Sequence, residues 1–199
     1  MNLPTKITIA RILLIPVFVA FFFLCDYVPY NRLIAAGIFA VAAFTDWVDG
    51  FLARKLNQVT DLGKFLDPIA DKLLVMCALL AILACPREDF QVTMAVMAMI
   101  ILSREFIVSA FRIIAAGKDI KLAADRLGKI KTVLQMAALL ILIPMSDIIY
   151  ITSSSGNAVE IFGIILLGGA TIMTVISGIN YIVMNREVLK TSDNNNAEQ

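Results

Sequence analysis

Apolar residues fill long stretches of the chain, and short polar segments separate them. A helix needs about 20 apolar residues to cross the roughly 30 Å hydrocarbon core of a bilayer. Stretches close to that length cover residues 7–26, 33–52, 67–86, 90–114, 130–151 and 159–184. The pattern therefore predicts an all-α, polytopic membrane protein with six transmembrane helices.

Composition supports this prediction and limits the number of domains. The chain has 199 residues, of which 60% are hydrophobic and 17% are charged. A soluble protein with these helices would have too few polar residues to cover its surface. We expect one six-helix domain over residues 1–190 in the lipid bilayer, followed by a disordered polar tail over residues 191–199.

The basic residues are distributed unevenly between the two sides of the predicted membrane. With the N-terminus on the cytoplasmic side, every Lys and Arg except Arg32 and Arg87 falls on that side. By the positive-inside rule, this predicts a multi-pass protein of the cell membrane with both termini facing the cytoplasm. The net charge of +1 does not indicate a nucleic-acid partner, and we expect none.

The chain contains no histidine, so the most usual general base and a common zinc ligand are missing. Cys25, Cys77 and Cys85 lie in or beside apolar runs, and we interpret them as small core residues. Acid–base or metal chemistry in this chain therefore depends on carboxylates.

Four aspartates stand near the cytoplasmic ends of the second and third apolar runs. Asp46 and Asp49 are i and i+3, whereas Asp67 and Asp71 are i and i+4, so each pair shares a helix face. Adjacent antiparallel helices bring all four to one depth, where uncompensated carboxylates repel one another. Oxygen ligands alone favour a hard cation, Mg2+ or Mn2+, and four carboxylates suffice for two ions. We place Pro68 in the first turn of its helix, where a missing N–H is tolerated.

Small residues and one arginine accompany these acids. Gly50 and Gly63 flank them and allow a ligand to approach the backbone, Ala53 shares their face, and Arg54 is a bidentate phosphate donor. As an alternative, the glycines serve helix packing or a turn, and single aspartates form salt bridges with Arg54 or nearby lysines. Four acids at this spacing favour a functional site, because ionisable groups inside membranes are costly.

The run from Asp46 to Asp71 reads D-x2-D-G-x2-A-R-x8-G-x3-D-x3-D. It resembles the signature of the CDP-alcohol phosphotransferases at every position. The resemblance implies a six-helix membrane enzyme, usually a homodimer. Such an enzyme transfers a phosphatidyl group from CDP-diacylglycerol to an alcohol and releases CMP.

The resemblance also implies roles for individual residues. Two divalent ions that hold the donor's pyrophosphate would be bound by Asp46, Asp49, Asp67 and Asp71. Asp71 would also be the catalytic base, which fits a chain without histidine. The residues expected to bind CDP-diacylglycerol are Thr8, Asp49, Gly50, Ala53, Arg54 and Gly63. For Thr8, with Thr5 and Arg11, a helix cap and an interfacial arginine are an equally good interpretation.

Two basic stretches, residues 102–112 and 122–132, are candidates for binding the acceptor alcohol. An acceptor that carries a phosphate needs fixed cations, and the candidates are Arg104, Arg112, Lys129 and Lys131. The alternative is ordinary positive-inside charge. Both stretches and residues 2–18 resemble those of bacterial phosphatidylglycerophosphate synthases, a branch of this family, which implies sn-glycerol 3-phosphate as acceptor. We interpret the chain beyond residue 135 as generic apolar helices.

Two other functions remain open from the sequence. A cardiolipin synthase of the same family would use phosphatidylglycerol as acceptor. A divalent-cation transporter would also carry acids in adjacent membrane helices. The transporter is disfavoured because an ion path needs polar groups through the membrane. Residues 33–44 and 73–85, in the outer halves of the second and third runs, are apolar.

Overall fold

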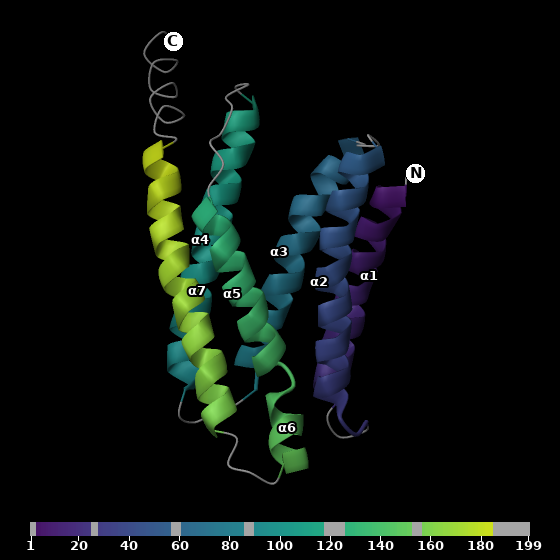
Figure 1. Cartoon of the computed structure of the whole chain (residues 1–199), viewed down its shortest axis with the longest axis vertical. Helices are drawn as coiled ribbons and strands as arrows, with labels where there is room; N and C mark the ends of the chain where they lie inside the picture. The colour runs from purple at the N-terminus through teal and green to yellow at the C-terminus, as the bar shows by residue number, and fades with distance from the viewer. Residues whose placement is uncertain are drawn as a thin grey trace. The chain divides into compact units, whose positions relative to one another are not determined.

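The computed structural model describes residues 3–24, 28–56, 61–85, 90–117, 126–152 and 157–184. Every regular element within these segments is an α-helix (Figure 1). In chain order they are α1 Leu3–Phe23, α2 Asn31–Leu56, α3 Asp61–Leu83, α4 Gln91–Gly117, α5 Arg126–Leu142, α6 Met145–Thr152 and α7 Asn157–Met184. The all-α prediction is confirmed for the described residues.

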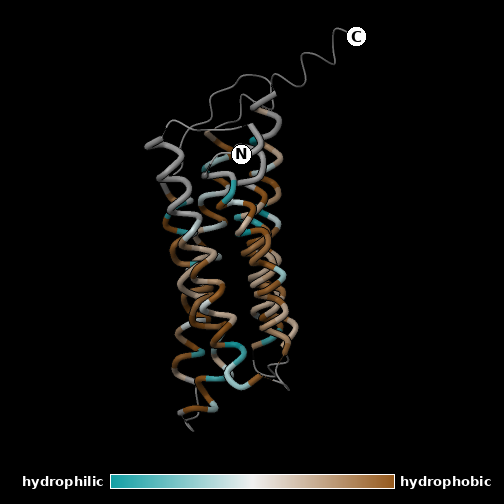
Figure 2. Tube along the Cα trace, turned by 90° about the vertical axis from the view of Figure 1, so that its right-hand side faces the viewer, coloured by the Kyte–Doolittle hydropathy of each residue, from teal (hydrophilic) through white to brown (hydrophobic). Residues whose placement is uncertain are grey.

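Length and hydropathy identify the helices that can cross a membrane. Among the described residues, α1, α4 and α7 qualify over Lys6–Phe23, Gln91–Arg112 and Ala158–Met184, and α5 with α6 adds a fourth, bent span. Figure 2 shows hydrophobic residues along most of the length of the helices. The chain is therefore a multi-pass membrane protein with three to four candidate spans in its described part. The total of six spans stays a prediction.

We predicted that the apolar run over residues 130–151 forms one helix, but the structure contains two helices there. The run divides at Pro144 into α5 and α6, whose axes differ by 43°. Proline has no N–H and its ring clashes with the carbonyl four residues earlier, so it favours a kink or a break in a helix, and here the helix breaks. The Pro144 carbonyl then accepts hydrogen bonds from the N–H groups of Asp147 (3.0 Å) and Ile148 (3.1 Å), which starts α6.

Helix α3 begins earlier than the hydrophobic pattern indicated. Its first residue is Asp61, so Pro68 lies beyond the first turn, and our placement of Pro68 in that turn was wrong. An acidic residue is favourable at a helix N-terminus, where backbone N–H groups lack partners. The consequence is a longer helix that carries the whole stretch from Gly63 to Asp71 without interruption.

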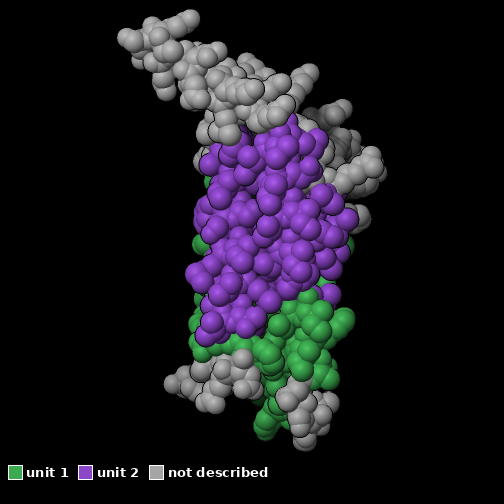
Figure 3. Space-filling view, turned by 90° about the vertical axis from the view of Figure 1, so that its left-hand side faces the viewer, with its two compact units in different colours: residues 1–91, 136–165 green, residues 92–135, 166–199 purple. Residues whose placement is uncertain are grey.

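The described residues divide into two compact units, coloured separately in Figure 3. The first unit comprises residues 1–91 and 136–165, and the second comprises residues 92–135 and 166–199. In the first unit, the buried rings of Phe18 and Phe22 on α1 and Phe39 on α2 form an aromatic core. The Phe18 ring centroid lies 6.0 Å from that of Phe22 and 5.9 Å from that of Phe39.

Polar contacts in the first unit connect α6 to the start of α2. The Leu33 N–H donates to the Asp147 carboxylate at 2.9 Å, and the Arg32 guanidinium donates to the Ser146 hydroxyl. The Asn31 amide donates to the carbonyl of Phe21 at 3.0 Å, at the end of α1. The bonds to the Leu33 N–H and to the Phe21 carbonyl satisfy backbone groups that helix ends leave open, whereas the bond between Arg32 and Ser146 joins two side chains.

Candidate active site

The first half of the aspartate signature lies on one continuous helix. Asp46, Asp49, Gly50, Ala53 and Arg54 all belong to α2, which continues to Leu56. Register alone puts Asp46, Gly50 and Ala53 on one face, at i, i+4 and i+7. The side chains of residues 46–56 lie outside the described part of the structure.

The second half lies on α3 in the same unit. Gly63, Asp67 and Asp71 follow one another at intervals of four residues, which keeps them on one helix face. Asp71 is half-buried, whereas the side chains of Gly63 and Asp67 lie outside the described part. No group of three or more potential metal ligands occurs among the described side chains, which include only Asp71 of the four aspartates. The metal site therefore stays a prediction.

Thr8 and Arg11 are buried on α1, each with 1% of its surface exposed. They are i and i+3, so they share a face of the helix. This burial disfavours the interpretation of Arg11 as an arginine that extends to the surface. The side chain of Thr5 lies outside the described part of the chain.

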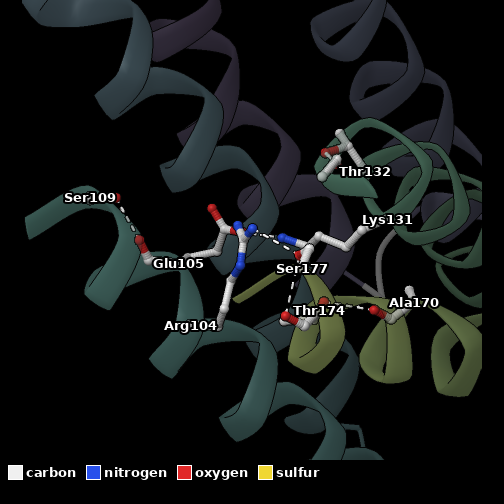
Figure 4. A network of polar contacts seen from close by, with 9 residues as sticks. Arg104, Glu105, Ser109, Lys131, Thr132, Ala170, Thr174 and Ser177 are labelled. Atoms are coloured by element: carbon white, nitrogen blue, oxygen red, sulfur yellow. Dashed lines mark hydrogen bonds and ion pairs between the residues drawn. The ribbon is translucent and has the colours of Figure 1, made fainter. Parts of the chain in front are cut away.

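A second cluster, in the second unit, is built around Arg104 on α4 (Figure 4). One terminal nitrogen of its guanidinium donates to the Ser177 hydroxyl on α7 at 2.9 Å. The other lies 3.3 Å from a carboxylate oxygen of Glu105. The Arg104 side chain is only 15% exposed.

The same Glu105 oxygen also accepts a hydrogen bond from the ammonium group of Lys131 on α5, as Figure 4 shows. Lys131 is buried, with 3% of its surface exposed. Two buried cations close together would repel each other, and a carboxylate between them offsets that repulsion. Glu105 is thus the residue that allows Arg104 and Lys131 to be neighbours. The sequence analysis missed it, although an acid inside an apolar run is itself a signal.

The four predicted acceptor cations are not equivalent in the structure. Arg104 and Lys131 take part in the buried cluster, whereas Arg112 and Lys129 are exposed. Lys129 is two residues from Lys131, which places their side chains about 200° apart around α5. One face of α5 therefore cannot present both lysines to one ligand.

Helix α7 carries a buried polar stripe, Thr171, Thr174 and Ser177, spaced three residues apart. The Thr171 hydroxyl donates to the Leu167 carbonyl at 2.8 Å, and the Thr174 hydroxyl donates to the Ala170 carbonyl at 2.6 Å. Ser177 differs because its hydroxyl also accepts from Arg104. The predicted apolar helix is confirmed for α7, but its contact with Arg104 distinguishes it from a generic one, and the regular spacing of hydroxyl residues was the signal for this.

Comparisons with known proteins agree with the signature. The family model for CDP-alcohol phosphatidyltransferase matches residues 1–176. Three relatives carry the name "CDP-diacylglycerol--glycerol-3-phosphate 3-phosphatidyltransferase". The Bacillus subtilis (strain 168) protein is 41% identical over 202 residues, covering 96% of this chain and 99% of the relative. The Rickettsia felis protein is 40% identical over 183 residues, covering 90% and 93%.

The Shigella flexneri protein is 41% identical over 183 residues, covering 91% of this chain and 93% of the relative. The matched regions include both the aspartate signature and the Arg104 cluster, because each alignment covers at least nine-tenths of the chain. The family predicted from the signature is confirmed, and the chain belongs to the CDP-alcohol phosphatidyltransferase family.

Proposed function

We propose that this protein transfers the phosphatidyl group from CDP-diacylglycerol to sn-glycerol 3-phosphate, which yields phosphatidylglycerol phosphate and CMP. The observation that carries the proposal is similarity of about 40% identity over nearly the whole chain to relatives named for this reaction. The presence of every signature position from Asp46 to Asp71 supports it.

We assign donor binding to the residues of α2 and α3. The carboxylates of Asp46, Asp49, Asp67 and Asp71 would hold two divalent ions, Mg2+ or Mn2+. The donor set fits such ions, because it contains only hard oxygen ligands, at i, i+3 and i, i+4 spacings on consecutive helices of one unit. When bound, the ions neutralise charge on the donor's pyrophosphate.

The remaining donor contacts come from small or hydrogen-bonding residues around the acids. Gly50, Ala53 and Gly63 leave space for the CDP group, and Arg54 offers two parallel N–H donors to a phosphate. Thr8, which is buried on α1, contributes a hydroxyl. This set gives the donor a fixed orientation before transfer.

We assign the role of general base to Asp71. A hydroxyl oxygen of the acceptor attacks the phosphorus of the phosphatidyl group, and its proton passes to the Asp71 carboxylate. The bond from that phosphorus to the oxygen of CMP breaks, and CMP leaves with the electron pair. Asp71 is half-buried, so its carboxylate is partly shielded from competing water.

We assign the acceptor's phosphate to Arg104 and Lys131. The Arg104 Nε is buried and has no hydrogen-bond partner among the residues that the structure describes, so it retains a donor for an incoming anion. Arg112 and Lys129 are exposed, and we assign them a solvent-screened attraction for the phosphate of the approaching acceptor rather than direct contact with it. An acceptor without a phosphate would leave the buried cations without their ligand.

The proposal includes the membrane arrangement. The protein forms a single domain over residues 1–190 with six transmembrane helices and a polar tail over residues 191–199. It functions as a homodimer in the cell membrane, with both termini and the active site on the cytoplasmic side. The orientation is supported by the concentration of Lys and Arg on that side, which the positive-inside rule interprets as cytoplasmic, and the homodimer follows from the resemblance to the family.

Acceptor choice is tested with purified full-length protein and CDP-diacylglycerol. We expect CMP release with sn-glycerol 3-phosphate, dependence on Mg2+ or Mn2+, and loss of release after chelation. CMP release with phosphatidylglycerol but not with glycerol 3-phosphate would instead identify a cardiolipin synthase. Metal flux into liposomes without CDP-diacylglycerol would identify a transporter.

A further inference from the structure

We propose that α7 is part of acceptor recognition, and that Ser177 and Gly178 are positioning residues for Arg104. This inference rests on the proposed function, in which Arg104 binds the phosphate of the acceptor. All three residues belong to the second unit. The role is indirect, because Ser177 and Gly178 act on the guanidinium and not on the substrate.

Ser177 fixes one end of the Arg104 guanidinium. Its hydroxyl accepts from a terminal nitrogen at 2.9 Å, and Ser177 itself has 0% of its surface exposed. The Ser177 hydroxyl also lies 3.3 Å from the carbonyl of Thr174, to which it donates, so the hydroxyl is oriented by its own helix. A buried hydroxyl held on both sides is a rigid support for a long, flexible side chain.

A hydroxyl suits this position better than a second carboxylate. Glu105 already holds the other terminal nitrogen of Arg104 and also pairs with Lys131. Another acid would cancel the positive charge that an anionic ligand needs, whereas serine orients the guanidinium without adding charge. Arg104 is thus fixed by two helices and keeps its attraction for phosphate.

Gly178 supplies the space that Arg104 occupies. A Cβ at this position would lie 3.1 Å from Cγ of Arg104 and 3.7 Å from its Nε. The first distance is shorter than ordinary van der Waals contact, so a methyl group would displace the side chain. It would also be in ordinary van der Waals contact with Nε and fill the space beside this nitrogen, which has no hydrogen-bond partner in the described part of the chain. The glycine therefore keeps open the donor that we assign to the acceptor.

The test uses the purified full-length protein with the variants Ser177→Ala and Gly178→Ala. We expect each to raise the Michaelis constant for glycerol 3-phosphate roughly ten-fold, because a hydrogen bond to a charged group is lost or misaligned. The Michaelis constant for CDP-diacylglycerol should change less than two-fold. The inhibition constant of inorganic phosphate, used as a competitor of the acceptor, should rise in parallel. Ser177→Thr keeps the hydroxyl, so its Michaelis constant for glycerol 3-phosphate should match that of the unsubstituted protein.

Two substitutions on the same helix serve as matched controls. Gly169→Ala adds a methyl group where no described atom lies within 4 Å, and Thr171→Val removes a hydroxyl that donates to the carbonyl of Leu167. Both should leave the two Michaelis constants unchanged. Thermal unfolding of every variant separates loss of folding from loss of acceptor affinity.

Arg104→Gln distinguishes failure of this inference from failure of the proposed function. If Arg104→Gln does not weaken use of glycerol 3-phosphate, the assignment of Arg104 to the acceptor is wrong. If it does, but neither Ser177→Ala nor Gly178→Ala raises that Michaelis constant, the positioning role is overturned and the proposed function stands. Equal increases in the Michaelis constants for glycerol 3-phosphate and CDP-diacylglycerol would also overturn the positioning role.

Discussion

At the scale of single residues, one carboxylate serves two cations that come from different helices. Glu105 accepts from Lys131 and lies 3.3 Å from a terminal nitrogen of Arg104, and it is 22% exposed at its side chain. In a buried setting the interaction between these charges is much stronger than in water, so removing one charge destabilises the folded position of the others. The cluster therefore functions as a unit.

Substituting Glu105→Gln should destabilise the protein, because it removes the negative charge that pairs with the buried Lys131. Breaking a fully buried pair costs roughly 3–5 kcal/mol, and we expect about 2 kcal/mol because Glu105 is partly exposed. Thermal or denaturant unfolding in detergent measures the change. The double variant Glu105→Gln with Lys131→Met should recover stability, and additive losses in the double variant would contradict the coupling.

Asp71→Asn should abolish turnover and largely spare donor binding, because an amide cannot accept the proton of the acceptor hydroxyl. Single-turnover CMP release and binding of CDP-diacylglycerol measure the two effects. We expect a rate loss of at least 100-fold, in the range that general-base catalysis contributes. Asp46→Asn is the comparison, since it should instead raise the concentration of Mg2+ required. A near-normal rate for Asp71→Asn would exclude it as the base.

At the scale of helices, the bend at Pro144 gives α6 a role that a continuous helix would not have. The bend leaves Ser146 and Asp147 at the start of a short helix, where both bond to the start of α2. The N–H of Leu33 lies in the first turn of α2 and needs an external acceptor. The residue before α2 is Tyr30, whose side chain cannot cap a helix as serine or aspartate does, so Asp147 supplies the acceptor from another helix.

Replacing Asp147→Ala should lower the stability of the protein by about 1 kcal/mol, the usual cost of losing an N-terminal cap. Asp147→Asn keeps a side-chain oxygen and should cost less. The Michaelis constants should not change in either variant, because Leu33 lies at the start of α2, whereas the signature residues lie near its end. Unfolding temperatures measure the predicted loss of stability. A change in acceptor affinity would contradict the prediction that the Michaelis constants stay the same.

At the scale of the whole molecule, the two compact units carry different parts of the proposed chemistry. The aspartate signature belongs to the first unit, and the cluster around Arg104 belongs to the second. The family match over residues 1–176 includes the signature and, within the cluster, Arg104, Glu105 and Lys131. Relatives that cover at least 90% of the chain therefore support one enzyme rather than a catalytic half joined to an unrelated half.

Topology provides a prediction for the whole chain. A green fluorescent protein fused after residue 199 should fluoresce, because we expect the C-terminus in the cytoplasm. An alkaline phosphatase fused after residue 155, in a connection that we expect outside, should be active. The physical reason is the retention of Lys and Arg on the cytoplasmic side. The reverse pattern would overturn the proposed orientation.

The sequence by itself determined the class of fold, the family and the residues of the signature. Apolar runs of about 20 residues have few stable solutions other than helices in a bilayer. The spacing from Asp46 to Asp71 is likewise a local property, because helical register follows directly from residue number. These features need no knowledge of which helices are neighbours.

Tertiary structure alone decided which cations are paired, and which helix supports them. Arg104, Lys131 and Ser177 are far apart in sequence, and charge counting could not separate the buried Lys131 from the exposed Lys129. Burial and pairing depend on contacts among α4, residues 126–135 of α5 and residues 166–184 of α7, which belong to the second unit, and a low dielectric there makes each unmatched charge costly. For that reason Glu105, Ser177 and Gly178 acquire their roles only in the folded protein.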